Sequence, residues 1–315
     1  MSAAHTTSAE REGQTFDGES LVARYANFVK LPHTLFALPF TGVGAILASY
    51  ESATGISVAA AGWIVLAFTS ARFAAMGFNR IVDRRYDALN PRTKLRELPS
   101  GRLTMPQAVG AVIVASALFM FSAFQLNALC GWLSPIALAW TFFYSFTKRF
   151  TSLSHYVLGL SLGIAPAGAY LSVSGHWTEP AWALPLLVGA VVLWVSGFDI
   201  IYALQDIDFD RGHGLNSIPA RLGVRRSLLL SRAGHGISVI LFALIFVLNA
   251  FPVHWFYAAA VAVAAVLLHF GHASVKVPDN RPIDVRAIDR AFFRTNVLVS
   301  MSFFALTLLD RLILA

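Results

Sequence analysis

Long apolar stretches recur along the whole chain and constrain its fold more than any other feature. A helix needs about 20 mostly apolar residues to cross the ~30 Å hydrocarbon core of a bilayer. Only 13% of the residues are charged, against roughly 25% in ordinary soluble domains. The pattern predicts an all-α, polytopic membrane protein in which about nine transmembrane helices form a bundle, at about residues 33–50, 57–78, 106–125, 129–146, 154–174, 181–204, 227–250, 252–272 and 292–313.

The N-terminal residues differ from the rest of the chain. Residues 1–20, "MSAAHTTSAEREGQTFDGES", are polar and contain no apolar run, which predicts a disordered tail and not a cleaved signal peptide. Residues 21–315 are expected to form a single transmembrane domain. A short interfacial helix should open it, because apolar side chains share one helical face at Leu21, Val22, Tyr25, Phe28 and Val29.

The basic residues lie in every second connection between the predicted spans. The short connections near 50–57, 126–131, 174–180 and 250–254 contain no Lys or Arg, and of the 24 Lys and Arg residues only Arg311 lies on their side. This asymmetry predicts that the N-terminus and the long loops are cytoplasmic. The expected location is the cell inner (plasma) membrane. The net charge of +7 is then a topology signal, and nucleic acid is not an expected partner.

Two segments far apart in the chain follow the same plan, so residues 33–150 and 154–290 are expected to be pseudo-repeat halves. The second span ends in "NRIVDRRYD" and the sixth in "DIIYALQDIDFD". Each is followed by a loop rich in Arg, Gly and Pro. Both segments therefore place carboxylates at the cytoplasmic end of a helix.

The first segment carries three oxygen-bearing side chains at Asn79, Asp83 and Asp87. Their i, i+4, i+8 spacing stacks them along one face of a helix over roughly 12 Å. The three arginines of the same segment are explained by topology alone. The regular spacing of the three oxygen-bearing side chains indicates a binding face.

The second segment repeats this arrangement. Asp206 and Asp210 are spaced i, i+4, and Asp199 precedes Asp206 by seven residues, which puts it on the same face of a regular helix. Tyr202 lies between Asp199 and Asp206. Asp208 points elsewhere on such a helix and is a weaker candidate.

Two opposed carboxylate faces would form a central cavity with hard oxygen ligands, open to the cytoplasmic side. Mg²⁺ keeps several waters and is commonly shared between one or two carboxylates and substrate phosphates. We therefore expect Mg²⁺ as the cofactor and a phosphate or diphosphate as the partner, with metal ligands drawn from Asn79, Asp83, Asp87, Asp206 and Asp210.

Cationic residues that could complete such a site occur nearby. Arg72 lies inside the second span, seven residues before Asn79, where a charge is costly unless it faces a cavity or a partner. Lys148 and Arg149 follow the fourth span, with Tyr144 one helical turn before Lys148. Arg suits forked phosphate contacts and Lys suits point-charge neutralisation.

Other interpretations of these residues stay open. Carboxylates and arginines at a helix end are often solvated flanks or surface ion pairs. Arg72 and Asp199 could form a structural ion pair, and Lys148 and Arg149 could serve topology alone. Five histidines show no HxxH or HxxxH spacing among themselves, and most of them are interpreted as structural or interfacial: His33, His155, His213, His235 and His272.

These segments resemble the UbiA-type family of intramembrane aromatic prenyltransferases. Asn79, Asp83 and Asp87 match that family's first motif on helix two, and the aspartates that begin with Asp199 resemble its second motif on helix six. "NPRTKLRELPSGRLT", "YSFTKRFTSLSH" and "GIAPAGAY" also resemble family blocks in the same order. The resemblance covers roughly residues 22–314.

The resemblance implies Mg²⁺-dependent transfer of a polyprenyl group from polyprenyl diphosphate to a small aromatic acceptor, in the bilayer and with no obligate protein partner. It implies catalytic roles for Asp83, Asp87, Asp206, Asp210, Tyr144 and Lys148. It implies contacts with the diphosphate or the aromatic acceptor for Arg72, Asn79, Arg149, Asp199 and Tyr202.

Two departures from the family pattern leave the acceptor open. Arg80 follows Asn79 where many members have Asp, and the first helix begins in "FVKLPHTLFALPF". The acceptor expected from the resemblance is an aromatic acid such as 4-hydroxybenzoate, in ubiquinone or menaquinone biosynthesis. A naphthoate-type menaquinone precursor and another aromatic or tetrapyrrole acceptor are the alternatives.

Two other classes of protein compete with an enzyme. A secondary transporter would use Asp199 and Arg72 as a coupling pair. Helices interrupted near mid-membrane would favour this class, and Pro166 in the fifth span gives it a little support. A membrane scaffold would have no reason to duplicate aspartate motifs. The absence of a phosphate-binding G-x-x-x-x-G-K-[ST] loop gives no support to ATP-driven transport.

Overall fold

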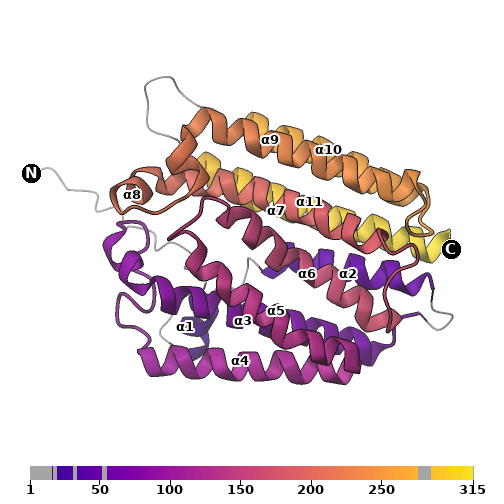
Figure 1. Ribbon diagram of the computed structural model, residues 1–315, viewed down its shortest axis with the longest axis horizontal. Coiled ribbons are helices and arrows are strands. Elements are labelled where there is room, and N and C mark those ends of the chain that lie inside the picture. The colour runs from indigo at the N-terminus through magenta and orange to yellow at the C-terminus, as the bar shows by residue number, and fades with distance from the viewer. Residues whose placement is uncertain (1–15, 17–19, 31–33, 52–54, 276–284, 315) are drawn as a thin grey trace, which may run out of the picture.

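The computed structural model describes residue 16 and residues 20–30, 34–51, 55–275 and 285–314. Within these ranges every regular element is helical, which confirms the predicted all-α class (Figure 1). The elements are α1 (Leu21–Phe28), α2 (Thr34–Ser49), α3 (Val58–Leu89), α4 (Met105–Leu126), α5 (Ala128–Thr147), α6 (Ser154–Ser174), α7 (Ala183–Ala203), η2 (Leu204–Asp206), α8 (Ile207–Gly212), α9 (Ile218–Val247), α10 (Trp255–Ser274) and α11 (Val285–Ile313).

Eight helices of the described chain are long and apolar enough to cross a membrane, and α2 adds a shorter apolar segment at Ala37–Ser49. Together they agree with the predicted bundle of about nine helices. The short helix expected before the first span is α1. The predicted polar tail falls almost entirely outside the described residues.

Helix α3 extends well beyond the span predicted for it. It begins after Ser57, whose side chain caps the helix by accepting a hydrogen bond from the Ala60 N–H, and it ends at Leu89. Its 32 residues reach about 48 Å, against a hydrocarbon core of about 30 Å. The last three turns of α3 therefore project past the apolar part of the bundle, and they carry the first aspartate motif.

The second motif does not lie on one regular helix, which differs from the prediction. Helix α7 ends at Ala203, a single 3-10 turn spans Leu204–Asp206, and α8 begins at Ile207. Asp199 is thus on α7, whereas Asp206 lies at the junction with α8. Asp208, the weaker candidate of this segment, lies on α8 and is exposed.

The bundle has one densely packed half. Helices α2, α7, α9, α10 and α11 share a core of large aromatic side chains. The ring of Phe40 on α2 lies 4.6 Å from that of Trp194 on α7 and 5.3 Å from that of Phe303 on α11. Figure 1 shows α9, α10 and α11 on the opposite side of the bundle from α3, α4 and α5. The aromatic core therefore provides a firm support for the other half.

Helices α2 and α6 approach each other at Gly44. A Cβ atom at this position would lie 2.0 Å from the carbonyl oxygen of Pro166 on α6. Helix α6 runs as one element from Ser154 to Ser174, through Pro166. The expectation of an interrupted helix that favoured a transporter is therefore wrong for this span.

We predict that Gly44→Ala destabilises the protein, because the added methyl group would collide with a backbone atom. Overpacking of this kind costs about 1–3 kcal/mol. The measurement is thermal unfolding in detergent. The matched control is Gly62→Ala in α3, where a Cβ atom meets nothing within 4 Å and Ala favours the helix by about 1 kcal/mol. Equal melting temperatures for the two variants would contradict the prediction.

Candidate active site

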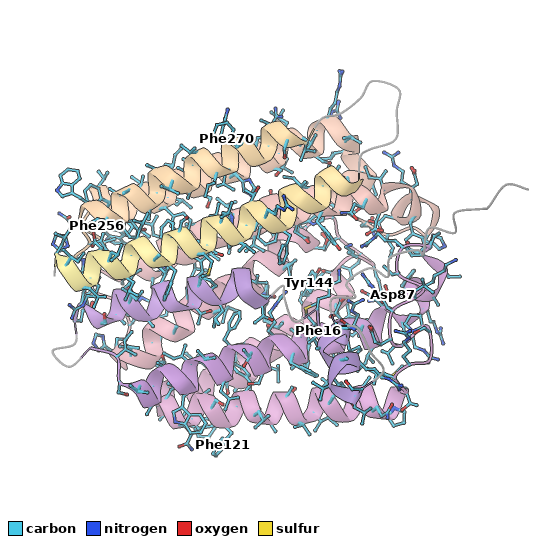
Figure 2. All side chains as sticks on the ribbon, turned by 180° about the vertical axis from the view of Figure 1, so that it is seen from behind. Phe16, Asp87, Phe121, Tyr144, Phe256 and Phe270 are labelled. Carbon is cyan, nitrogen blue, oxygen red and sulfur yellow. The ribbon has the colours of Figure 1, made fainter. Side chains whose placement is uncertain are left out.

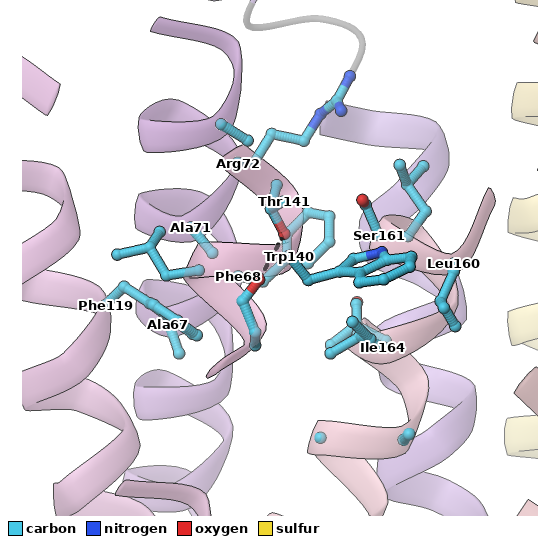
Figure 3. A pocket seen from close by; sticks show the side chains of 18 of the residues that line it. Ala67, Phe68, Ala71, Arg72, Phe119, Trp140, Thr141, Leu160, Ser161 and Ile164 are labelled. Atoms are coloured by element: carbon cyan, nitrogen blue, oxygen red, sulfur yellow. Dashed lines mark hydrogen bonds between the residues drawn. The ribbon is translucent and has the colours of Figure 1, made fainter. Parts of the chain in front are cut away.

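A cavity of about 670 Å³ lies between helices of the less densely packed half, and it confirms the predicted central cavity. Most of its wall is apolar, but Arg72, Tyr144, Asp199 and Tyr202 also line it. Figure 3 shows Arg72 at one end of this view, with the indole ring of Trp140 lying toward α6. The cavity thus joins charged groups to a long apolar chamber.

The face of α3 carries the first carboxylate cluster. The Asn79 side-chain amide donates a hydrogen bond of 3.0 Å to Asp83, as expected for residues one turn apart. Arg149 donates to the other oxygen of Asp83 at 2.9 Å. The Arg96 guanidinium contacts Asp87 at 2.6 Å. Each aspartate of this cluster is therefore already paired with an arginine.

The second cluster is bound to the first through the segment that follows α3. Arg92 donates to both oxygens of Asp206, and the Asn90 amide donates to Asp206 at 3.0 Å. Arg92 also donates to the hydroxyl of Tyr202 at 3.1 Å. Asn90 is the residue that caps the C-terminal end of α3, so its bond to Asp206 connects that end of α3 with the second motif.

Tyr202 is held by cations from two other parts of the chain. The Lys30 ammonium donates to its hydroxyl at 3.0 Å and lies 5.4 Å from the centre of its ring. Lys30 has a φ of +46°, which is uncommon for a residue other than glycine. The backbone after α1 is thus bent so that Lys30 reaches the cavity.

Lys148 lies among four carboxylates. Loss of solvent around Lys148 opposes its charge, but Asp210, Asp206, Asp199 and Asp83 together outweigh this and raise the pKa of its ammonium group. Lys148 therefore stays charged at neutral pH. Its charge interacts with aspartates of both carboxylate clusters.

Tyr144 lies one turn before Lys148 and lines the cavity. It is within electrostatic reach of Arg72, Asp83 and Asp199. Figure 2 shows Tyr144 inward of Asp87, which lies closer to the end of the bundle. Tyr144 is thus placed among charged groups that come from two other helices, α3 and α7.

Asp199 is bound by His155, one of the histidines interpreted from the sequence as structural or interfacial. The Nδ1 atom of His155 lies 2.6 Å from an Asp199 carboxylate oxygen. The sequence left open an ion pair between Arg72 and Asp199. In the structure the partner of the Asp199 carboxylate is His155. The interpretation in which Lys148 and Arg149 serve topology alone is incomplete, because Arg149 also binds Asp83.

The residues fit a divalent ion with hard oxygen ligands. One carboxylate oxygen of Asp87 and one of Asp210 are buried and make no hydrogen bond within the described part of the chain. No three His, Cys, Asp or Glu side chains in that part converge closely enough to form a metal site by themselves. A Mg²⁺ ion here would therefore rely on waters or substrate oxygens, as this ion commonly does.

Sequence reasoning missed several residues that contact the site. Asn90, Arg92, Arg96 and Lys30 were part of basic segments whose charge was explained by topology. Arg80 was explained in the same way, yet it is only 4% exposed and lines the cavity. The available signal was the concentration of Arg and Asn directly after the first motif.

Comparison with known proteins agrees with this architecture. Residues 37–297 match the UbiA prenyltransferase family. The 4-hydroxybenzoate octaprenyltransferase of Salmonella paratyphi B is 31% identical over 274 residues, which cover 84% of this chain and 91% of that protein. A polyprenyl transferase of Arthrobotrys oligospora is 36% identical over 165 residues, 52% of this chain, and the match spans 44% of that longer protein.

Solved structures share the fold. The apo structure of a UbiA homolog from Aeropyrum pernix K1 has a TM-score of 0.76 at 35% identity and covers 89% of this chain and 98% of that one. A UbiA homolog from Archaeoglobus fulgidus, solved bound to GPP and Mg²⁺, has a TM-score of 0.70 at 18% identity and covers 90% and 98%. The chain therefore belongs to the UbiA prenyltransferase family, and it is a multi-pass membrane prenyltransferase.

Proposed function

We propose that the protein transfers a polyprenyl group from polyprenyl diphosphate to an aromatic acid such as 4-hydroxybenzoate, in lipoquinone biosynthesis. The proposal is supported by the similarity to 4-hydroxybenzoate octaprenyltransferase over 84% of the chain. The observation that carries it is the position of two carboxylate clusters, both paired with arginines of the connection after α3, at the polar end of an apolar cavity.

The carboxylate clusters are proposed to bind the diphosphate through Mg²⁺. The ligands would come from Asn79, Asp83, Asp87, Asp206 and Asp210. One buried carboxylate oxygen of Asp87 and one of Asp210 make no hydrogen bond with the described residues, which supports this assignment, as does the Archaeoglobus fulgidus homolog bound to GPP and Mg²⁺. When bound, Mg²⁺ neutralises charge that develops on the leaving diphosphate.

The chain's own cations stabilise the same charge. Arg72 lines the cavity, Lys148 lies among the carboxylates of both clusters, and Arg149 is held on Asp83. Cations fixed in place before the reaction stabilise a developing negative charge without the cost of reorganising solvent. We assign these three residues to the diphosphate, and we assign Asp199, Tyr202 and Tyr144 to the space where the aromatic acceptor meets the allylic carbon.

The apolar chamber accommodates the prenyl chain and keeps water from the reactive allylic group. Asp83, Asp87, Asp206 and Asp210 lie at one end of the bundle, and the Lys and Arg bias places that end in the cytoplasm. The proposed location is therefore the cell inner membrane with the N-terminus and site loops cytoplasmic. Residues 21–315 would then act as one transmembrane domain, with the two carboxylate clusters in its two halves.

A naphthoate-type acceptor is the second candidate. The observation that favours it is the segment "FVKLPHTLFALPF", which departs from the usual start of the first helix. Lys30 of this segment reaches Tyr202 at the cavity wall. The departure in sequence therefore bears on the region that we assign to the acceptor.

We predict that Asp83→Asn and Asp206→Asn each lower prenyl transfer by about 10²–10³-fold, because each removes a charge that helps to hold the diphosphate complex. The measurement is turnover in membrane fractions with labelled polyprenyl diphosphate across a Mg²⁺ titration. Asp208→Asn is the matched control, since Asp208 is exposed on α8. Chelation of divalent ions should abolish activity of the unaltered protein.

Near-normal turnover of Asp83→Asn and Asp206→Asn at saturating Mg²⁺ would contradict the assignment of Mg²⁺ to the carboxylate clusters. Transfer that is unaffected by chelation would contradict it as well.

The acceptor is tested with a panel that contains 4-hydroxybenzoate, a hydroxynaphthoate and a benzoate without the hydroxyl group. We expect transfer to at least one hydroxylated acid and none to the unsubstituted benzoate, because an electron-rich ring must attack the allylic carbon. Product formation is measured by chromatography of labelled lipid. Transfer to none of the hydroxylated acids would reject this class of acceptor.

Trp140 is predicted to limit the length of the prenyl chain. It lies one turn before Tyr144 on α5 and lines the cavity. Trp140→Ala should raise kcat/KM for long donors relative to short ones by about tenfold, since apolar pockets discriminate by about 10–200-fold through steric fit. Trp132→Ala, an exposed position of the same helix, is the control. An unchanged ratio of long to short donors would contradict the prediction.

A further inference from the structure

His155 is a fully buried histidine whose two ring nitrogens both have partners. Its Nδ1 atom lies 2.6 Å from an oxygen of Asp199, and its side chain is 0% exposed. Its Nε2 atom lies 3.3 Å from the backbone nitrogen of Ile218. The histidine thus connects the first turn of α6 with α7 and with the start of α9.

The partners determine which nitrogen carries the proton. A backbone N–H can only donate, so Nε2 must accept the hydrogen bond from Ile218. In the neutral ring the proton then lies on Nδ1, which donates to the Asp199 carboxylate. The contact between His155 and Asp199 therefore has a defined direction.

The surroundings of His155 keep its ring in place. The Ser196 hydroxyl on α7 donates to the His155 carbonyl at 3.1 Å. One turn along α6, a Cβ atom at Gly159 would lie 2.6 Å from the Val192 carbonyl oxygen of α7. Helices α6 and α7 are thus in close contact here, and the ring cannot move without moving them.

Asp199 faces the cavity on its other side. Its side chain is 17% exposed and lines the cavity. The hydrogen bond from His155 uses one carboxylate oxygen, Oδ2. The second oxygen has no hydrogen-bond partner among the described residues, and Tyr144 and Lys148 lie within electrostatic reach of it.

We infer that His155 is a positioning residue that acts through Asp199. It holds Oδ2 of the carboxylate so that Oδ1 accepts a hydrogen bond from the hydroxyl group of the aromatic acceptor. This inference rests on the proposed function. The hydroxyl becomes a stronger donor as positive charge develops on the attacked ring, so the contact strengthens in the transition state.

The test is a double-mutant cycle on the full-length protein, assayed with prenyl diphosphate and the hydroxylated acid that the unaltered protein accepts. His155→Leu should lower kcat by about 10–100-fold, the usual cost of losing a side chain that orients a functional group. The KM for prenyl diphosphate should stay unchanged. In the Asp199→Asn background the same substitution should add little, because coupled residues are not additive.

Two further variants separate positioning from support of the fold. His155→Asn places an amide donor near the position of Nδ1 and loses the contact with Ile218, so it should recover most of the lost kcat. His176→Leu is the control for loss of a histidine, because His176 is exposed and lies just beyond the C-terminal end of α6. Melting temperatures in detergent identify any variant that fails to fold.

The outcomes distinguish this inference from the proposed function. If the unaltered protein transfers no prenyl group to any hydroxylated acid, the proposed function fails. If the unaltered protein does transfer a prenyl group, two results would show that His155 does not act through Asp199. One is an equal loss of activity in His155→Leu and His155→Asn. The other is that the losses of His155→Leu and Asp199→Asn simply add. A change confined to the KM for prenyl diphosphate would overturn the inference in the same way.

Discussion

The pairing of carboxylates with arginines at one end of the bundle is the interaction on which the rest of the structure depends. A carboxylate beside an apolar cavity is costly unless a cation compensates it. Asp83, Asp87 and Asp206 are each paired with an arginine from another segment of the chain. Because Arg92 and Arg96 belong to the connection after α3, these pairs also fix that connection over the cavity and bring the ends of α3 and α7 together.

The packing of the bundle complements this charge arrangement. Helices α2, α7, α9, α10 and α11 bury their aromatic side chains against one another, whereas the less densely packed half encloses the cavity. A rigid half supports the charged groups, and a hollow half leaves room for an apolar substrate. A transporter would instead place its charges at interrupted helices near mid-membrane, and α6 is continuous through Pro166.

Local patterns made the helices and both aspartate motifs predictable, because apolar length and the spacing of Asn79, Asp83 and Asp87 are properties of neighbouring residues. Contacts that depend on tertiary structure were not predictable in this way. Arg92 meets Asp206 across 114 positions of sequence, and His155 meets Asp199 across 44. The 3-10 turn at Leu204–Asp206 contains neither Gly nor Pro, so nothing in the local sequence marked the departure from a regular helix.

The same charges can serve both the empty and the loaded site. Without substrate, the carboxylates neutralise the arginines, which allows all of them to stay beside a cavity. With the proposed substrate, the carboxylates would face Mg²⁺ and the arginines would face the diphosphate, so each group exchanges one ionic partner for another of the same sign. Lys148 lies among four aspartates, which raise the pKa of its ammonium group. The opposing charges that a diphosphate and a divalent ion require are therefore both present at this end of the bundle.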